Sequence, residues 1–187
     1  MTSEQREYLV SHYRIRRLNT EDEIKSFNCG DSDLNDFILH DARPYREAKL
    51  AVTYAMYAEA DRSHVAAYFS LANDRVSLVD FDSKTEFNRF RRYRFPNEKR
   101  LRSYPAVKLC RLGVDLSDRE LSIGTFILNF IKSYFVSDNK TGCRFLTVDA
   151  YASAVPFYEK NGFVPLHEAD AADATRLLYF DLNDVDE

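Results

Sequence analysis

The sequence changes its apolar periodicity twice between residues 106 and 150, and this change restricts the fold more than any other feature. Residues 106–114 alternate as a strand does, residues 125–135 place apolar side chains on one helical face, and residues 145–150 are again rich in strand formers. A strand, a helix and a second strand in succession form a parallel pair joined by a right-handed crossover. The sequence therefore predicts an α/β fold with parallel central strands.

The segments on either side of this unit extend the predicted sheet. Further strands are predicted over residues 13–18, 52–57, 65–71 and 176–182. A short polar link joins the second and third of these, which should pair as an antiparallel hairpin. Helices are predicted over residues 20–27, from residue 31 or 32 onward, and over 152–160 with Gly162 closing the last one. We therefore expect a mixed sheet with helices on both faces.

The length of 187 residues suits one domain, so we expect a single domain over residues 1–187. Its core should cover about residues 13–182, and an acidic tail follows over residues 183–187. Residues 74–104 interrupt the apolar pattern and contain a basic cluster. We expect these residues to form an irregular or partly helical insertion.

The composition excludes several classes of protein. Apolar residues make up 45% of the chain and charged residues 30%, which is typical of a globular protein and not of a disordered one. A run of about 18 apolar residues, as a membrane-spanning helix requires, is missing. The first residues also lack the apolar stretch of a secretory signal. A cytoplasmic location is the expectation that follows.

The cysteines and histidines are spaced neither for a disulfide framework nor for a metal site. The chain has three cysteines and four histidines: Cys29, Cys110, Cys143, His12, His40, His64 and His167. The cysteines are odd in number and none belongs to a CxxC pair, and the histidines are isolated from one another. We interpret Cys110 as a packed thiol and the histidines as surface or half-buried residues. The sequence therefore predicts no metal site.

Residues 112–125 predict a site for an anion. They read as the end of a strand, a short loop and the start of a helix, whose first amides are unpaired and whose dipole is positive at this end. The small residues Ser122 and Gly124 would let a ligand approach the backbone closely. A phosphate or pyrophosphate fits this arrangement, although it is not a Walker loop. The alternative is an ordinary helix start that Ser122 and Gly124 only cap.

Two motifs in this part of the chain resemble those of the GNAT acyltransferases. The segment Arg119-x-x-Ser122-x-Gly124 resembles the acetyl-CoA loop [QR]-x-x-G-x-[GA] of that family. About thirty residues later, the segment Ala154-x-x-Phe157-Tyr158-x-x-x-Gly162-Phe163 looks like its second signature, A-x-x-F-Y-x-x-x-G-F. Residues 27–37 and Tyr104-Pro105 resemble the branch that contains tRNA-acetylating toxins. The resemblance extends over residues 13–182.

This resemblance implies a cofactor, acetyl-CoA, whose pantetheine arm enters between splayed strands 107–114 and 145–150. The arm would pair with the main chain near Leu112 and Val114, and the Leu112 N–H would hydrogen-bond the thioester carbonyl. The amides of residues 120–125 would hold the pyrophosphate, with Arg119 as a counter-charge. The cofactor-binding residues implied are Leu112, Gly113, Val114, Arg119, Glu120, Leu121, Ser122, Ile123, Gly124 and Thr125.

The resemblance also implies that Tyr158 protonates the departing thiolate after an amine has attacked the thioester directly. An ordinary phenol, with a pKa near ~10, would suit a thiol with a pKa near ~8.5. The alternative for Tyr158 is an aromatic core residue, as most aromatic residues at helical spacing are. Two positions depart from the family pattern, because Ser122 replaces a glycine and Tyr151 stands where many relatives have asparagine.

No general base is evident from the sequence. Glu59, Asp115 and Asp118 are acidic residues near loops, and we interpret them as solvated surface charges. Water, or an acceptor amine that is already deprotonated at the working pH, would then suffice.

Residues 89–102, which we call the basic segment, carry seven Arg or Lys and one Glu, a net charge of +6. Its arginines alternate with Phe90, Tyr93 and Phe95, a mixture that suits phosphate contacts and base stacking in RNA. The chain as a whole has a net charge of −4, whereas RNA-binding proteins are usually basic. The sequence therefore favours a segment that docks on its own domain or forms a homodimer contact.

Three functions remain open at this point. The first is an acetyl-CoA-dependent N-acetyltransferase that acts on a primary amine. The second is a toxin-like acetyltransferase that acts on aminoacyl-tRNA through the basic segment. The third is an acyl-CoA-binding module with little turnover, which Ser122 and the missing base would explain.

Overall fold

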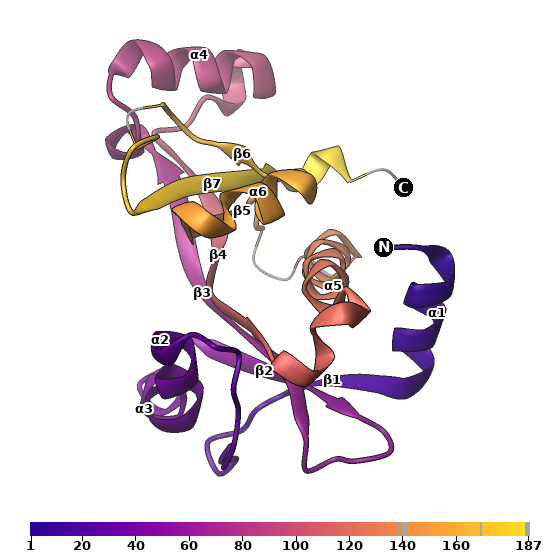
Figure 1. The fold of residues 1–187 in the computed structure, drawn as a ribbon. Helices are drawn as coiled ribbons and strands as arrows, with labels where there is room; N and C mark the ends of the chain where they lie inside the picture. The colour runs from indigo at the N-terminus through magenta and orange to yellow at the C-terminus, as the bar shows by residue number, and fades with distance from the viewer. Residues whose placement is uncertain (138, 140–141, 169, 186–187) are drawn as a thin grey trace. The chain divides into compact units, whose positions relative to one another are not determined.

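The computed structural model describes residues 1–137, 139, 142–168 and 170–185, which form an α/β fold (Figure 1). The strands in the described residues are β1 (Tyr13–Arg17), β2 (Val52–Ala58), β3 (Val65–Ser77), β4 (Ser103–Val114), β5 (Phe145–Tyr151), β6 (Val164–Pro165) and β7 (Thr175–Asp181). The helices are α1 (Ser3–His12), α2 (Ser32–Asp36), the π-helical turn η1 (Phe37–Asp41), α3 (Ala42–Glu47), α4 (Lys84–Arg94), α5 (Ile123–Ser137) and α6 (Val155–Lys160). Short 3₁₀ turns are η2 (Leu78–Asp80), η3 (Asn97–Lys99), η4 (Leu116–Leu121), η5 (Ala152–Ala154) and η6 (Leu182–Asp184).

The strands follow the order β1-β2-β3-β4-β5-β7-β6 in one mixed sheet. β1 with β2, β2 with β3, β5 with β7 and β6 with β7 are antiparallel. β4 and β5 are parallel, and their register runs from Ala106 opposite Phe145 to Lys108 opposite Thr147. Beyond these pairs β4 continues to Val114 and β5 to Tyr151. The predicted α/β class, the hairpin and the parallel pair are therefore confirmed.

The chain divides into two compact units, which we describe separately. The first unit comprises Met1–Ala72 and Leu109–Ile131, and the second comprises Asn73–Lys108 and Lys132–Glu187. The strands β3 and β4 and the helix α5 each contribute residues to both units. The predicted organisation as a single domain over residues 1–187 stays a prediction.

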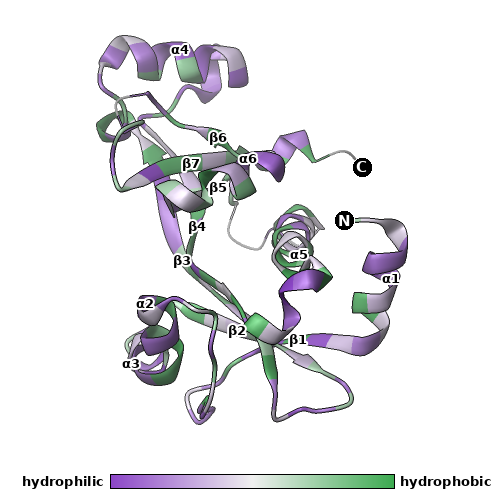
Figure 2. Ribbon diagram, in the orientation of Figure 1, coloured by the Kyte–Doolittle hydropathy of each residue, from purple (hydrophilic) through white to green (hydrophobic). Residues whose placement is uncertain are grey.

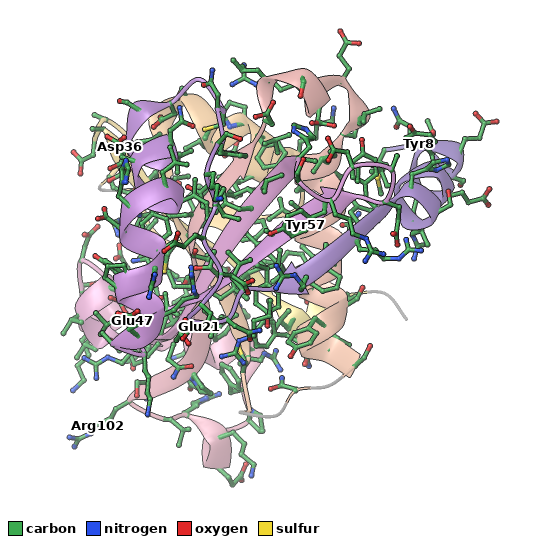
Figure 3. The ribbon with its side chains drawn as sticks, turned by 90° about the horizontal axis from the view of Figure 1, so that it is seen from below. Tyr8, Glu21, Asp36, Glu47, Tyr57 and Arg102 are labelled. Atoms are coloured by element: carbon green, nitrogen blue, oxygen red, sulfur yellow. The ribbon has the colours of Figure 1, made fainter. Side chains whose placement is uncertain are left out.

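Two neighbouring residues of β3 show how the first unit covers both faces of its strands. The buried Tyr68 ring lies 5.1 Å from the Phe27 ring and 6.2 Å from the Phe37 ring, on the face that α2 and α3 cover. The next ring, Phe69, lies 6.1 Å from Phe130 of α5, because successive side chains of a strand point to opposite faces. Figure 1 shows α2 and α3 on one side of these strands and α5 on the other, and Figure 3 shows the α2–α3 segment between the labels Asp36 and Glu47.

The second unit repeats this arrangement around β7. The Tyr179 ring lies 5.4 Å from Phe90 of α4 and 5.8 Å from Phe145 of β5. The next residue, Phe180, turns to the opposite face and lies 5.7 Å from Phe163, directly after α6. The predicted helices on both faces are thus present in each unit.

The prediction of a helix over residues 20–27 is wrong. Residues 18–31 form a turn and extended chain instead, because Asp22 is captured by groups outside the expected helix. Its carboxylate accepts hydrogen bonds from the Asn19 amide at 2.6 Å and from Arg16 of β1 at 2.7 Å. A capping box forms at another place, where Thr2 and Gln5 begin the unpredicted helix α1.

The other predicted elements agree with the structure, with shifted ends. The helix expected from residue 31 or 32 is α2, and the Asp31 carboxylate caps it by accepting the Leu34 amide at 3.0 Å. β3 extends to Ser77 and β4 begins at Ser103, so the partly helical segment between them is narrower than the predicted 74–104. The two-residue strand β6 was missed. Of the predicted acidic tail 183–187, the last two residues lie outside the described part of the chain.

The cysteines Cys29, Cys110 and Cys143 are all free thiols, as expected. Within the described residues, every helix falls short of the length and apolar character that crossing a bilayer requires.

Candidate active site

In the first unit, β4 leads through the turn η4 to the N-terminus of α5, as the sequence predicts. Leu112, Gly113 and Val114 are the last three residues of β4. Gly113 is required by its surroundings, since a Cβ atom at this position would lie 2.8 Å from the Tyr68 ring and 3.1 Å from the Phe27 ring. The end of β4 therefore packs directly on the aromatic core under α2.

Ser122 is the residue that turns the chain into α5. Its φ of 58° is left-handed, a conformation that glycine adopts readily and serine rarely. This explains why the family motif has a glycine at the matching position. The Phe126 amide donates to the Ser122 carbonyl at 3.1 Å, so the amides of Ile123, Gly124 and Thr125 precede the helical hydrogen bonds of α5. Glu120 and Leu121 lie in η4, directly before this turn, and their part in the cradle stays a prediction.

The loop 115–122 is held by residues 28–30, on a segment far away in the sequence. The Leu116 amide donates to the Asn28 carbonyl at 2.9 Å, and the Asn28 amide donates to the Asp115 carboxylate at 3.1 Å. Arg119 donates to the Cys29 carbonyl. The predicted counter-charge thus also braces the loop, and the segment that resembles the toxin branch supports the predicted anion site.

Asp118 is not a solvated surface charge, so the interpretation made from the sequence is wrong for this residue. Only 7% of it is exposed, and its carboxylate accepts hydrogen bonds from Tyr13 at 3.0 Å and Ser117 at 3.1 Å and pairs with His64 at 2.7 Å. Burial and the neighbouring carboxylate raise the pKa of Tyr13 to about 12. Asp118 therefore fixes η4 on β1 and on the β2–β3 loop.

His64, Asp115 and Asp118 are the one group of possible metal ligands within the described residues. Their ligand atoms lie within 4.8 Å of one another. The hydrogen bonds that Asp115 and Asp118 make with protein groups account for this grouping, so it gives no reason to assign a metal. The sequence had suggested an isolated His64. In the structure His64 is paired with the carboxylate of Asp118.

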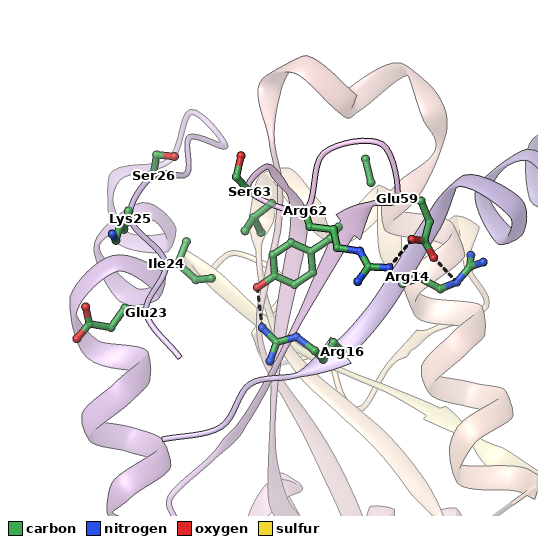
Figure 4. A pocket seen from close by; sticks show the side chains of 12 residues that line it. Arg14, Arg16, Glu23, Ile24, Lys25, Ser26, Glu59, Arg62 and Ser63 are labelled. Carbon is green, nitrogen blue, oxygen red and sulfur yellow. Dashed lines mark hydrogen bonds and ion pairs between the residues drawn. The ribbon is translucent and has the colours of Figure 1, made fainter. Parts of the chain in front are cut away.

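The other acidic candidate for a base, Glu59, is committed to ion pairs. Its carboxylate lies 2.8 Å from Arg14 and 3.0 Å from Arg62, and the hydrogen bond from Arg62 lowers its pKa. These residues line a pocket of about 670 Å³ on the first unit, between β1, β2 and residues 23–26 (Figure 4). Figure 4 shows Arg14 and Arg62 turned to Glu59. Arg16 donates a hydrogen bond to the Tyr57 hydroxyl at 3.5 Å. The pocket lining includes neither Tyr158 nor any of the predicted cofactor-binding residues.

In the second unit, Tyr158 lies on α6, as the sequence predicts. Tyr158 is 7% exposed, and the centroid of its ring lies 5.1 Å from that of Phe157 and 5.5 Å from that of Phe163. Burial raises the pKa of Tyr158 to about 12. The expectation of an ordinary phenol is therefore wrong, since this hydroxyl stays protonated more firmly than a solvated tyrosine does.

The basic segment has one docked face and one exposed face. Phe90 is buried against Phe145 and Tyr179, and Arg94 donates to the Tyr179 hydroxyl. Arg89, Arg92 and Tyr93 are exposed, Tyr93 by 80%. In Figure 2 α4 is largely hydrophilic with isolated apolar positions, which agrees with this division.

Reasoning from the sequence missed one buried titratable residue, which contacts the turn after the helix of Tyr158. Lys132 on α5 is 9% exposed and contacts the turn that follows α6. The sequence feature that could have revealed Lys132 is its place four residues after Leu128, on the apolar face of an otherwise apolar helix.

The comparisons with known proteins agree with this geometry. Residues 99–178 match the family model of the acetyltransferase (GNAT) domain. Residues 99–178 are therefore similar to a GNAT acetyltransferase domain. The matched residues include β4, the loop 115–122, α5 and Tyr158, so both motifs found in the sequence fall within this region. No curated protein sequence is significantly similar to the chain.

Solved structures with the same fold include several toxins. AtaT in complex with acetyl-methionyl-tRNAfMet has a TM-score of 0.67 and 21% identity, over 92% of this chain and 96% of that one. A structure described as a bacterial toxin has a TM-score of 0.72 and 14% identity, over 91% of each chain. A mutant of KacT has a TM-score of 0.67 and 19% identity, over 92% of this chain and 96% of that one. At these identities the likeness establishes the fold.

Proposed function

We propose that the chain is an acetyl-CoA-dependent N-acetyltransferase that transfers an acetyl group to a primary amine by direct attack. The observation that carries this proposal is the left-handed Ser122 between β4 and α5, inside the region that is similar to a GNAT domain, which leaves three successive amides at the start of α5. AtaTR has been solved with acetyl-CoA bound, which supports the choice of cofactor. Cytoplasmic acetyl-CoA would be the source, in a compartment where the three free thiols stay reduced.

The cofactor would be held mainly by main-chain groups. The amides of Ile123, Gly124 and Thr125 suit the pyrophosphate, because unpaired amides and the dipole of the 15-residue α5 both favour an anion. The amides and carbonyls of Leu112 and Val114, at the end of β4, would pair with the pantetheine arm as an added strand. Arg119 adds a positive charge next to the phosphates.

The reaction forms a C–N bond and breaks a C–S bond. The acceptor amine attacks the thioester carbon, and the Leu112 N–H donates a hydrogen bond to the oxygen that becomes negative. When the intermediate collapses, the thiolate leaves with the electron pair of the C–S bond. The acceptor nitrogen loses its proton to water, because the acidic side chains Glu59, Asp115 and Asp118 are held by protein partners.

Tyr158 would stabilise the leaving thiolate. With a pKa of about 12, its hydroxyl stays protonated at every physiological pH and is a permanent hydrogen-bond donor. Full proton transfer to a thiolate with a pKa near ~8.5 would be unfavourable in water, but the burial that weakens the phenol as an acid also makes a thiolate a stronger base. We assign Tyr158 the role of donor and, as the C–S bond breaks, of general acid; water then returns a proton to the phenolate.

A second candidate function is the acetylation of aminoacyl-tRNA. It is favoured by the exposed Arg89, Arg92 and Tyr93 on α4 and by the fold shared with AtaT, solved with acetyl-methionyl-tRNAfMet. Arginines beside an exposed aromatic ring suit phosphates and unstacked bases. Salt-sensitive binding of charged tRNA that is lost in an Arg89→Ala/Arg92→Ala variant would support this candidate, with the exposed Lys160→Ala as a control.

A third candidate is an acyl-CoA-binding module, and one experiment separates all three. Thiol release from acetyl-CoA is followed with small primary amines, with peptides and with aminoacylated total tRNA. Release with any primary amine supports the first function, and release confined to charged tRNA supports the second. Binding of acetyl-CoA without release for any acceptor would overturn the enzyme in favour of the module. Sedimentation of the same samples tests whether the basic segment forms a homodimer contact, the alternative to docking on its own domain.

A further inference from the structure

The C-terminal end of α6 is built as a Schellman turn around Tyr158. The Phe163 amide donates to the Tyr158 carbonyl at 3.1 Å, and the Gly162 amide donates to the Glu159 carbonyl at 2.9 Å. Gly162 has a φ of 81°, the left-handed conformation that this motif needs. The rings of Tyr158 and Phe163 then meet at 5.5 Å, so the turn that ends the helix also packs the tyrosine.

Lys132 holds this turn from the neighbouring helix α5. Its ammonium donates to the carbonyl of Asn161, the last residue before Gly162, at 2.5 Å. It lies 3.7 Å from the centroid of the Phe180 ring and 5.4 Å from that of Phe163. A carbonyl at a helix C-terminus has no partner within the helix, and a cation is the group that best satisfies it.

The position of this ammonium is costly for the fold. Lys132 is 9% exposed, and within the described residues it has no carboxylate partner, only the Asn161 carbonyl and the faces of two rings. Burial lowers the pKa of Lys132 to about 8. An apolar side chain of the same length would fill this space without removing a charge from water. A structural role alone therefore explains a lysine here poorly.

We propose that Lys132 is a positioning residue that orients Tyr158 through the Asn161 carbonyl and the Phe163 ring. This inference rests on the proposed role of Tyr158 at the departing thiolate. A rigid turn fixes the direction of the tyrosine hydroxyl, and a small displacement of such a donor costs rate without changing how the cofactor binds.

The test is a double-mutant cycle on thiol release from acetyl-CoA, with aminoacylated total tRNA and n-butylamine as separate acceptors. Lys132→Met should lower kcat roughly tenfold and leave KM for acetyl-CoA within about twofold. In a Tyr158→Phe background the same change should have no further effect on kcat, since the residue acts through the hydroxyl that is already missing. Lys160→Met, on the exposed end of α6, is the matched control and should behave as wild type.

Thermal unfolding distinguishes positioning from stability. Lys132→Met should melt at the wild-type temperature or above it, because it removes a buried charge that lacks a carboxylate partner. Lys132→Gln retains a donor for the Asn161 carbonyl and is measured in the same cycle if the methionine variant does not fold. A fall in kcat that parallels a fall in melting temperature would overturn the proposal, and so would equal losses of kcat in the two backgrounds.

The outcomes also separate this inference from the proposed function. If Tyr158→Phe lowers kcat and Lys132→Met does not, the positioning role fails and the proposed function stands. If Tyr158→Phe leaves kcat unchanged, the role of Tyr158 fails, and the role of Lys132 fails with it. Wild-type protein that releases no thiol with small primary amines, peptides or aminoacylated tRNA overturns both.

Discussion

The N-terminus of α5 and the C-terminus of α6 both turn through a left-handed residue, Ser122 in one and Gly162 in the other. They differ in what the turn leaves available. At α5 the turn leaves amides that suit a negative charge, and hydrogen bonds from residues 28–30 hold the loop in place. At α6 the turn directs a single side chain, Tyr158, and aromatic rings with one buried cation hold it.

This difference teaches where each region should tolerate substitution. A cradle made of backbone depends on conformation, so its weak points are residues whose shape fixes the chain, such as Gly113 and Ser122. A hydroxyl held by packing depends on one atom and on the groups that orient it. Changes at α5 should therefore affect cofactor binding and stability, whereas changes at α6 should affect turnover.

Removal of the Tyr158 hydroxyl should have the largest effect. Tyr158→Phe is expected to lower kcat about 100-fold, because the thiolate loses its donor, and to leave the affinity for acetyl-CoA unchanged. Steady-state kinetics with free-thiol detection measure both. Tyr179→Phe, a buried tyrosine on the opposite face of β7, is the control for loss of a phenol elsewhere. A Tyr158→Phe variant with the kcat of the wild type would contradict the claim that the α6 region acts on turnover through the Tyr158 hydroxyl.

The next effect is steric and belongs to the first unit. Gly113→Ala places a methyl group 2.8 Å from the fully buried Tyr68 ring, and we expect it to destabilise the fold by about 2 kcal/mol. Gly142→Ala meets no atom within 4 Å and should lose only about 1 kcal/mol, through its left-handed φ. Urea unfolding compares the two. Equal losses would show that the end of β4 is not packed as described.

The third effect is a pH dependence of the free energy of unfolding that arises from the buried Lys132, the cation that contacts the turn after α6. The pKa of Lys132 falls from 10.5 in the unfolded chain to about 8 in the fold, so below pH 8 the ammonium is charged in both states and its burial is fully unfavourable. Between about pH 8 and 10.5 the unfolded chain binds more protons, and the free energy of unfolding should rise with pH by about 1–3 kcal/mol. The rise is measured as the difference from Lys132→Met, in which it should be missing. A difference that stays flat across this range would contradict the burial of a charged lysine.

The smallest effect tests the strain at the α5 turn. Ser122→Gly should stabilise the protein by about 1 kcal/mol, because glycine adopts a φ of 58° without a Cβ clash. Lys49→Gly, at the other non-glycine residue with this φ among the described residues, should stabilise by a similar amount. Ser122→Gly should alter the affinity for acetyl-CoA, and Lys49→Gly should not. An equal change of affinity in both variants would show that residue 122 has no particular role in binding acetyl-CoA.

The α5 turn could largely be predicted from the sequence, because its signals are local. The alternation before Gly113, the small residues 122 and 124 and the apolar face of α5 lie within about 30 consecutive residues. The prediction of a helix over residues 20–27 was wrong because Arg16 and the Asn19 amide donate hydrogen bonds to Asp22, which compete with the local capping pattern. Hydrogen bonds that override local propensity in this way are visible only in the structure.

The support for Tyr158 could not be predicted, since its partners are far apart in the chain. Lys132 contacts Asn161 and Phe180, and nothing local marks those two as its neighbours. The burial of Asp118 escaped prediction for the same reason, because His64 and Tyr13 cover it from distant segments. The raised pKa of Tyr158 follows from burial, which the motif does not reveal.

Calorimetric titration with acetyl-CoA tests the central claim most directly, that the start of α5 holds the cofactor's pyrophosphate. The wild type and Ser133→Asp, at an exposed position later in α5, should bind acetyl-CoA with the same affinity. Ser122→Asp should bind at least about tenfold more weakly, since it places a carboxylate where the pyrophosphate is proposed to lie. No heat with the wild type, or equal affinity in all three proteins, would contradict the account.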